Sequence, residues 1–192
     1  MLKDYLKYLE SHCKKFKKEN EEIFDIVIYG SFVKGKYDFK DIDLMILLID
    51  LSLAKRLEIA QNLKSVLKKE IKNIDIKTMN LEEFFEESFL ARQGILIEGI
   101  SLIRGKTVAE LIGFKGFSIF TYNLKNLNHN KKIQFNYALS GRDKKGMMEI
   151  LNGESLGRGV VQIPIDKSKE FEDFLNKWEI NHKIKNSLES KI

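Results

Sequence analysis

The sequence predicts an α/β fold, with a small mixed sheet flanked by helices, followed by a smaller α+β part. Two observations support this fold class. As far as Gly105, short runs of apolar and β-branched residues alternate with longer segments of helical periodicity. After Gly105, glycines become frequent and the alternation ends, which places a boundary within 105–115. We therefore expect two domains, residues 1–110 and residues 111–192.

The first domain is expected to follow the order α-β-α-β-α-β-α, in which helices that join strands are typical of an α/β layer. The expected elements are a helix over 2–20, a strand over 24–29, a short helix over 31–36, a strand over 43–49, a long helix capped by Ser52, a strand over 74–79, a helix from about 81 to 97 capped by Asn80, and a short strand over 101–103. The long helix is expected to bury one apolar stripe, formed by Leu53, Leu57, Ala60, Leu63, Leu67 and Ile71.

The second domain is expected to mix strands and helices without that regular alternation. Pro164 cannot donate to a strand ladder, so the strand that contains it is expected near a sheet edge. The expected elements are strands over 117–122 and 160–165, helices over 124–139 and 167–178, and a final strand from Asn181.

The composition is that of a globular protein, with 43% hydrophobic and 32% charged residues. No apolar run reaches the roughly 18–20 residues that are needed to cross a bilayer. The N-terminal residues mix charged with apolar side chains, unlike a signal peptide. The one cysteine, Cys13, excludes an intramolecular disulfide and a zinc site built on several cysteines. We therefore expect a cytoplasmic protein without a membrane partner.

The net charge of +5 comes from the second part of the chain. Residues 1–113 carry 19 basic and 19 acidic side chains, whereas residues 114–192 carry 14 and 9. The segment 115–146 holds seven basic residues and one acid, a balance that attracts phosphate backbones. A solvated helix face has the same composition. The aromatic residues beside these lysines could stack on bases, but at helical spacing we favour a core role for them: Tyr122, Phe135 and Tyr137.

Two acids flank one isoleucine at the start of the strand over 43–49. Side chains at i and i+2 of a strand point the same way, so Asp41 and Asp43 are expected to share one face. Carboxylates held this close resist joint ionisation, and Mg²⁺, which prefers oxygen ligands, would relieve the repulsion. Asp75 interrupts the next apolar strand and can join them if the two strands are neighbours. Three carboxylates can hold two metal ions about 3.5–4 Å apart.

A Gly-Ser pair ends the preceding strand. Gly30 allows the backbone to approach a ligand closely. The N–H groups that open the next segment favour phosphate, and the Ser31 hydroxyl can add a donor. One end of the motif is therefore suited to phosphates and the other to metal. The alternative interpretations are a solvated turn for Asp41 and Asp43, and an ordinary edge-strand acid for Asp75.

The motif G-S-x₉-D-x-D, which runs from Gly30 to Asp43, together with Asp75 on a later strand, resembles the DNA polymerase β-type nucleotidyltransferase superfamily. Within it, the sequence is most similar to the small prokaryotic minimal nucleotidyltransferases. The resemblance covers about residues 20–105, including G-I-L-I-E-G-I-S-L-I-R-G at 94–105.

Two features depart from the family pattern. Lys40 stands where members often have a small hydroxyl residue. Minimal nucleotidyltransferases commonly work with a separate all-helical partner, whereas this chain continues beyond the resemblance with a segment that matches no family we recognise.

The resemblance implies metal-dependent transfer of NMP from an NTP, AMP from ATP in particular, with release of pyrophosphate. It assigns metal binding to Asp41, Asp43 and Asp75, for two Mg²⁺ ions or Mn²⁺ in their place. It assigns triphosphate binding to Gly30 and Ser31, and activation of the acceptor hydroxyl to Asp75.

The expected functions differ in which molecule accepts the nucleotidyl group. A protein acceptor would make the chain similar to an antitoxin-type enzyme that adenylylates a partner toxin, and a nucleic-acid acceptor would use the basic segment 115–146. A small molecule is the third choice. The alternative to an enzyme is a non-catalytic nucleotide-binding interaction module or a nucleic-acid-binding protein.

Overall fold

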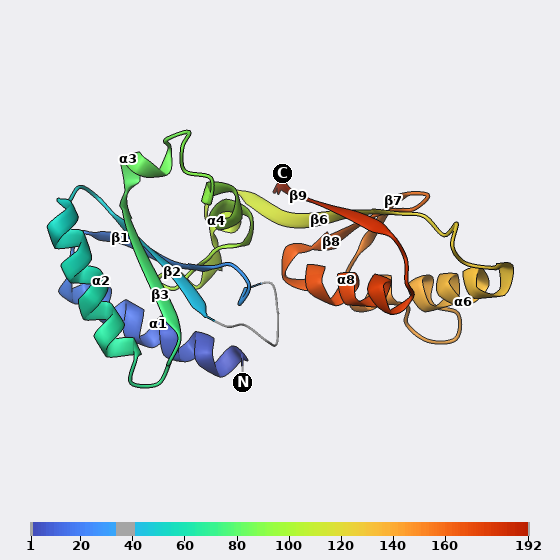
Figure 1. Cartoon of the computed structure of the whole chain (residues 1–192), viewed down its shortest axis with the longest axis horizontal. Helices are drawn as coiled ribbons and strands as arrows, with labels where there is room; N and C mark the ends of the chain where they lie inside the picture. The colour runs from blue at the N-terminus through green and yellow to red at the C-terminus, as the bar shows by residue number, and fades with distance from the viewer. Residues whose placement is uncertain (1, 34–40, 192) are drawn as a thin grey trace. The chain divides into compact units, whose positions relative to one another are not determined.

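The structure, a computed structural model, describes residues 2–33 and 41–191 (Figure 1). The chain divides into two compact units, residues 1–112 and residues 113–192. Each unit has its own sheet and its own buried cluster of apolar side chains. No helix in the described parts of the chain is both long and apolar enough to span a bilayer.

The first unit is a mixed α/β structure. Its elements are α1 (Leu2–Glu19), β1 (Ile23–Tyr29), β2 (Ile42–Leu48), α2 (Leu53–Leu67), β3 (Ile74–Asn80), α3 (Leu81–Phe84), α4 (Arg92–Glu98), β4 (Ile100–Ser101), β5 (Lys106–Thr107) and α5 (Val108–Leu111). The strand order in the sheet is β3-β2-β1-β4-β5. β2 and β3 are parallel, whereas β1 is antiparallel to both β2 and β4. The predicted fold class of this part, a small mixed sheet with helices, is confirmed.

Helices cover both faces of this sheet. On one face, even-numbered residues of β1 and β2 such as Ile28 and Leu44 pack with α1 and α2 around Leu9 and Leu63. On the other face, the odd-numbered residues pack with α3 and α4, as Met45 does. The near-continuous burial of β2 follows from this arrangement, because a strand covered on both faces has no solvated side.

Two helix predictions for this unit are wrong in detail. Leu53 and Leu57 are 60% and 50% exposed, because Ile59 takes part in the buried face and rotates it away from them. The single helix expected over 81–97 is interrupted between α3 and α4. Four glutamates lie in this stretch with like charges four residues apart, which destabilises a helix: Glu82, Glu83, Glu86 and Glu87.

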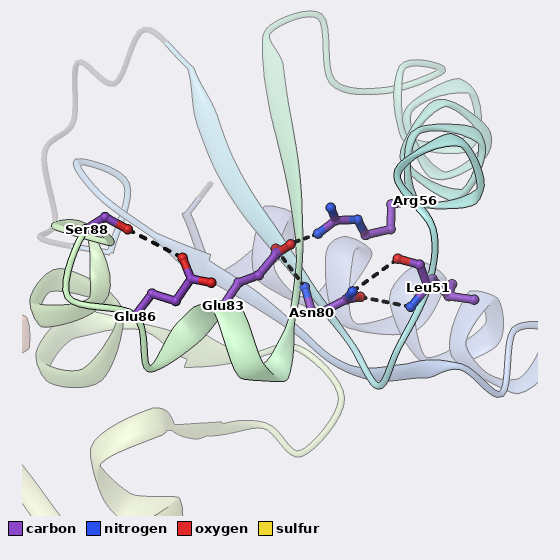
Figure 2. A network of polar contacts seen from close by, with 6 residues as sticks. All are labelled: Leu51, Arg56, Asn80, Glu83, Glu86 and Ser88. Atoms are coloured by element: carbon purple, nitrogen blue, oxygen red, sulfur yellow. Dashed lines mark hydrogen bonds and ion pairs between the residues drawn. The ribbon is translucent and has the colours of Figure 1, made fainter.

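A polar network ties α2 to α3 at the far end of β3 (Figure 2). The Asn80 side chain accepts a hydrogen bond from the Leu51 N–H and donates one to the Leu51 carbonyl, each 3.1 Å long. The Glu83 carboxylate accepts from the Asn80 N–H and pairs with Arg56, whose side chain is only 12% exposed. The hydrogen bond from Arg56 holds the pKa of Glu83 below its usual value. Asn80 therefore opens α3 as predicted, and it also anchors the segment before α2.

The second unit has the order β-α-α-β-β-α-β. Its elements are β6 (Phe114–Tyr122), α6 (His129–Ser140), α7 (Met147–Ile150), β7 (Glu154–Gly157), β8 (Val160–Pro164), a 3-10 turn η1 (Ile165–Lys167), α8 (Ser168–Lys177) and β9 (His182–Ser190). The sheet is antiparallel with the order β7-β8-β6-β9. Apart from the short α7, this is the β-α-β-β-α-β arrangement of ferredoxin-like folds.

The core of the second unit lies between the sheet and its two main helices. Phe120 of β6 packs against Phe171 of α8 at a ring distance of 4.8 Å, and Phe135 of α6 is fully buried in the same cluster. The core role favoured for Phe135 is therefore confirmed. Tyr137, by contrast, is 45% exposed and lies beneath the Arg142 guanidinium.

The strand with Pro164 lies near a sheet edge, as expected, because β8 is next to the edge strand β7; Pro164 is its last residue, beyond the ladder with β7. One prediction for this unit needs correction. The helix expected from 124 begins only at His129, because the Asn128 side chain accepts a hydrogen bond from the Lys131 N–H and caps it there.

Candidate active site

The predicted site residues Asp43 and Asp75 meet on one face of the first sheet. The register of β1, β2 and β3 places Tyr29 opposite Asp43, and Asp43 opposite Asp75. Asp43 and Asp75 lie two and four residues before Met45 and Met79, so their side chains point to the same face of the sheet, which α3 and α4 cover further along. Tyr29 packs against the same cluster. Two carboxylates therefore stand side by side at the ends of neighbouring parallel strands.

The surroundings of Asp43 disfavour its negative charge. Its pKa is raised above the ordinary value, first by partial burial and then by the charge of Asp75. The charge of Asp41 also raises the pKa of Asp43, to a smaller extent, whereas the nearby Lys77 ammonium lowers it. Asp43 is thus an anionic site that a cation would stabilise.

Gly30 lies directly against the Asp43 carboxylate. Its backbone has φ +81°, in the left-handed region that favours glycine, and a Cβ added there would come within 2.6 Å of Asp43 Oδ2. The turn that continues through Ser31 therefore begins at van der Waals distance from the acid. This contact brings the predicted phosphate-binding backbone and the predicted metal ligand together.

Asp75 and Asp41 are both accessible to solvent. The Asp75 side chain is 48% exposed, and the Lys77 ammonium approaches its Oδ2 to 3.7 Å. Asp41 immediately precedes β2 and is exposed. Among residues 2–33 and 41–191, no three Asp, Glu, His or Cys side chains are already gathered closely enough to hold a metal ion. The structure thus pairs Asp43 with Asp75 and leaves Asp41 at the rim of the pair.

The donor set fits a hard divalent cation. Asp43 and Asp75 offer oxygen ligands from adjacent strands in register, and Asp41 stands two residues before Asp43. Partial burial and, after it, the like charge of Asp75 raise the pKa of Asp43, and a bound Mg²⁺ would stabilise the anion against both. The exposed sides of Asp41 and Asp75 leave room for water, which Mg²⁺ usually retains.

Tyr29 is a site residue that sequence reasoning missed. Burial, with the charges of Asp43 and Asp75, raises the pKa of its hydroxyl to about 12. Tyr29 therefore stays neutral over the whole physiological range and places an O–H group beside the acid pair. The signal in the sequence was its position as the last strand residue before Gly30, but its neighbours became visible only through the strand register.

Part of the predicted phosphate-binding segment lies outside the described residues. Residues 31–33 form a turn. The remainder of the short helix expected over 31–36, and the departure at Lys40, fall within 34–40, which the structure does not describe.

A second buried acid, Asp25, belongs to the framework. Its carboxylate accepts hydrogen bonds from Ser101 Oγ at 2.8 Å and from Arg104, which joins β1 to the end of β4. Arg104 also lies over the Phe24 ring at 5.1 Å. Since both lone-pair edges of Asp25 are engaged, it is not a further metal ligand.

A mixed sheet with two acids in register beside a glycine turn is an arrangement that could hold divalent cations and phosphate side by side. Residues 11–101 match the family described as "Polymerase beta, Nucleotidyltransferase". The chain therefore contains a polymerase beta-like nucleotidyltransferase domain, and the predicted resemblance is confirmed. No curated protein matches the sequence.

Solved structures of a toxin–antitoxin system are similar to the chain. One is a mutant of the MntA-HpeT toxin–antitoxin, at 23% identity and a TM-score of 0.37, covering 48% of this chain and 70% of that one. Another is a toxin–antitoxin structure with AMP-PNP, at 26% identity and a TM-score of 0.37, covering 48% of this chain and 71% of that one.

Proposed function

We propose that the protein is an active nucleotidyltransferase that moves NMP, with AMP from ATP the first donor to test, onto a protein or nucleic-acid hydroxyl. The observation that carries the proposal is the contact between Gly30 and the Asp43 carboxylate, with Asp75 in register beside it. A structural role rarely requires two neighbouring carboxylates, one of them with a raised pKa. The family match over residues 11–101 supports the same reaction.

Each candidate site residue has a role in the proposed reaction. Asp41, Asp43 and Asp75 would hold two Mg²⁺ ions, or Mn²⁺, which when bound offset the negative charge of the transferring phosphoryl group. The backbone at Gly30 and the Ser31 hydroxyl would bind the triphosphate.

Asp75 would accept the proton of the acceptor hydroxyl. The acceptor oxygen then bonds to the α-phosphorus, the bond between that phosphorus and the bridging oxygen breaks, and pyrophosphate leaves. The exposed side of the Asp75 carboxylate suits this role, because the acceptor must reach it from solvent. The neutral Tyr29 hydroxyl beside the pair would orient Asp43 as a ligand.

The acceptor hydroxyl belongs either to a protein or to a nucleic acid. A protein acceptor would be a toxin-like partner that carries a target hydroxyl. A nucleic acid would contact the basic segment 115–146, and its binding would weaken steeply with salt. A salt titration of complex formation therefore separates the two classes.

Incubation with labelled NTP, Mg²⁺ and candidate acceptors tests the proposal. We expect labelled acceptor with the native chain, none above background with Asp43→Ala, and full labelling with Asp50→Ala, an exposed acid at the other end of β2. Absence of both transfer and metal-dependent NTP binding would overturn the proposal. Metal-dependent binding without transfer to any acceptor would instead identify a nucleotide-binding module.

A further inference from the structure

The second unit contains a cavity of about 650 Å³ that is lined by none of the residues assigned to the metal and the triphosphate. It lies where β6 ends, between the loop that follows β6, one side of α6 and the turn that joins β7 to β8. Residues far apart in the sequence line it together: Tyr122, Asn123, Lys125, Lys132, Asn136 and Arg158.

The lining is cationic. Lys125, Lys132 and Arg158 face the cavity, and no acidic residue lines it. None of these three cations forms an ion pair with another residue in the described part of the chain, whereas Lys145 and Lys169 elsewhere in the unit are paired with glutamates. Lys132 is also partly buried, so its charge is less screened by water than that of an ordinary surface lysine.

The turn that carries Arg158 is held in place by its glycines. Gly159 has φ +72°, and a Cβ added there would lie 2.4 Å from the Tyr122 carbonyl oxygen. The Tyr122 N–H donates a hydrogen bond of 2.8 Å to the Gly159 carbonyl. Only glycine permits this close approach of the turn to β6, and the turn places Arg158 at the cavity.

The remaining lining is suited to a base and its polar edges. The Tyr122 ring is half-buried and supported edge-on by Phe135 at 5.8 Å, which leaves it a preorganised aromatic surface. The side chains of Asn123 and Asn136 supply amide donors and acceptors. Lys132 and Asn136 lie one helical turn apart on α6 and therefore present a cation and an amide side by side.

We propose that this cavity is a nucleotide-binding site: Lys125, Lys132 and Arg158 hold the phosphate, and Tyr122 stacks on the base. Phosphate requires convergent cations without competing acids, which the lining provides. Aromatic stacking accepts any base. The nucleotide comes either as a free mononucleotide or as one residue of a single strand, and both share this chemistry. The site needs no metal, and mononucleotide binding there does not depend on the proposed transfer reaction. A single strand bound there would use Lys125 and Lys132, which belong to the basic segment 115–146 that the proposed function gives to a nucleic-acid acceptor.

Binding by the full-length protein in EDTA tests the site apart from the metal-dependent one. The probes are AMP, inorganic phosphate and a fluorescein-labelled ten-nucleotide single-stranded RNA. We expect Lys132→Gln and Arg158→Gln each to weaken nucleotide binding by about tenfold, as loss of a charge-assisted contact does. The matched control is Lys131→Gln, the neighbouring exposed lysine outside the cavity, which should change the affinity less than about twofold.

Tyr122→Leu separates stacking from charge. It should weaken AMP and RNA binding while leaving phosphate binding unchanged, because leucine offers no aromatic surface. Native-like melting of each variant shows that the fold is intact. Tighter binding of RNA than of AMP identifies the single strand as the source, and equal binding identifies the mononucleotide.

Three results would each overturn the proposal. The first is absence of AMP and RNA binding at millimolar concentration. The second is equal loss with Lys131→Gln and Lys132→Gln, which would mean a diffuse basic surface. The third is phosphate binding as tight as AMP binding, which would leave the base without a role.

Discussion

The two units of this protein carry opposite charges at their candidate sites and assemble them differently. In residues 1–112, Asp43 and Asp75 are adjacent because the strands that carry them are paired in register. In residues 113–192, Lys132 and Arg158 line one cavity because a helix and a hairpin turn converge at the end of β6. The acids of the first site are visible in the sequence because each interrupts an apolar strand, whereas the cations of the second site lie on a helix and in a turn, where charges are ordinary.

The sheets differ in the same way. The first is covered by helices on both faces, so polar residues on its strands are conspicuous interruptions of apolar runs. The second has its core on the side of α6 and α8, and the odd-numbered residues 115–121 of β6 are partly or fully exposed. Polar residues on its strands are therefore expected, and none of them marks a site.

Removal of a carboxylate should have the largest effect on the rate of nucleotidyl transfer. It also tests whether the transfer reaction depends on residues of the first unit alone. Asp75→Asn should lower nucleotidyl transfer by about 100-fold or more, because it loses both a metal ligand and the acceptor base. The measurement is the initial rate of label transfer at saturating NTP. Arg158→Gln, the counterpart in the second unit, should leave Mg²⁺-dependent NTP binding unchanged; a loss there would mean that the two sites are not independent.

Gly30→Ala should weaken NTP binding by about tenfold and lower the free energy of unfolding by about 1–3 kcal/mol. The new Cβ would strike the Asp43 carboxylate in a backbone conformation that alanine disfavours. NTP titration and chemical denaturation measure the two effects.

Two glycines serve as controls for this change. Gly105 has φ +65° with nothing within 4 Å of an added Cβ, so Gly105→Ala isolates the backbone strain. Gly94 lies in α4 with open space around it, and Gly94→Ala should stabilise the protein slightly. Equal NTP affinity in Gly30→Ala and Gly105→Ala would show that the close approach of Gly30 to Asp43 does not contribute to NTP binding.

Glu83→Gln tests the framework of the first unit and should destabilise it by about 1–3 kcal/mol, since it leaves the largely buried Arg56 guanidinium without its anion. The pKa of Glu83 is lowered in the folded state, so its contribution is fully present above the unfolded value, near 4.5, and is lost as the pH falls through the lower folded value. Urea denaturation from pH 7 downward measures this. A variant whose unfolding free energy differs from native by the same amount at every pH would contradict it.

Lys77→Gln should have the smallest effect, below about 1 kcal/mol on stability, because its ion pair with Asp75 is solvent-exposed. Lys77 lowers the pKa of Asp43, so its removal should raise that pKa further and move the midpoint of Mg²⁺ binding to higher pH. Titration of Mg²⁺ at several pH values, with Lys72→Gln as the control, detects the shift. A midpoint that moves to lower pH would show that Lys77 does not act on Asp43.

Much of the first unit could be predicted from the sequence, because its strands are apolar runs bounded by turn residues. Strand ends at Tyr29 and Leu48 came within a residue of expectation. The break between α3 and α4 was missed because apolar periodicity continues through a stretch whose glutamates repel one another. Leu57 was predicted to be buried but is exposed. The buried side of an amphipathic helix is decided by the surface against which the helix packs, and the sequence of the helix does not show that surface.

The sequence by itself predicted which acids form the first candidate site: Asp41 and Asp43 are two residues apart, a spacing that implies a shared strand face because side chains alternate along a strand. Only the tertiary structure decided which residues join it. Pairing of β1, β2 and β3 places Tyr29 and Asp75 on either side of Asp43, and the turn at Gly159 places Arg158 in the lining of the cavity that also contains Lys132. Neighbours across a sheet or a cavity are set by packing between distant segments, and local sequence spacing carries no record of that packing.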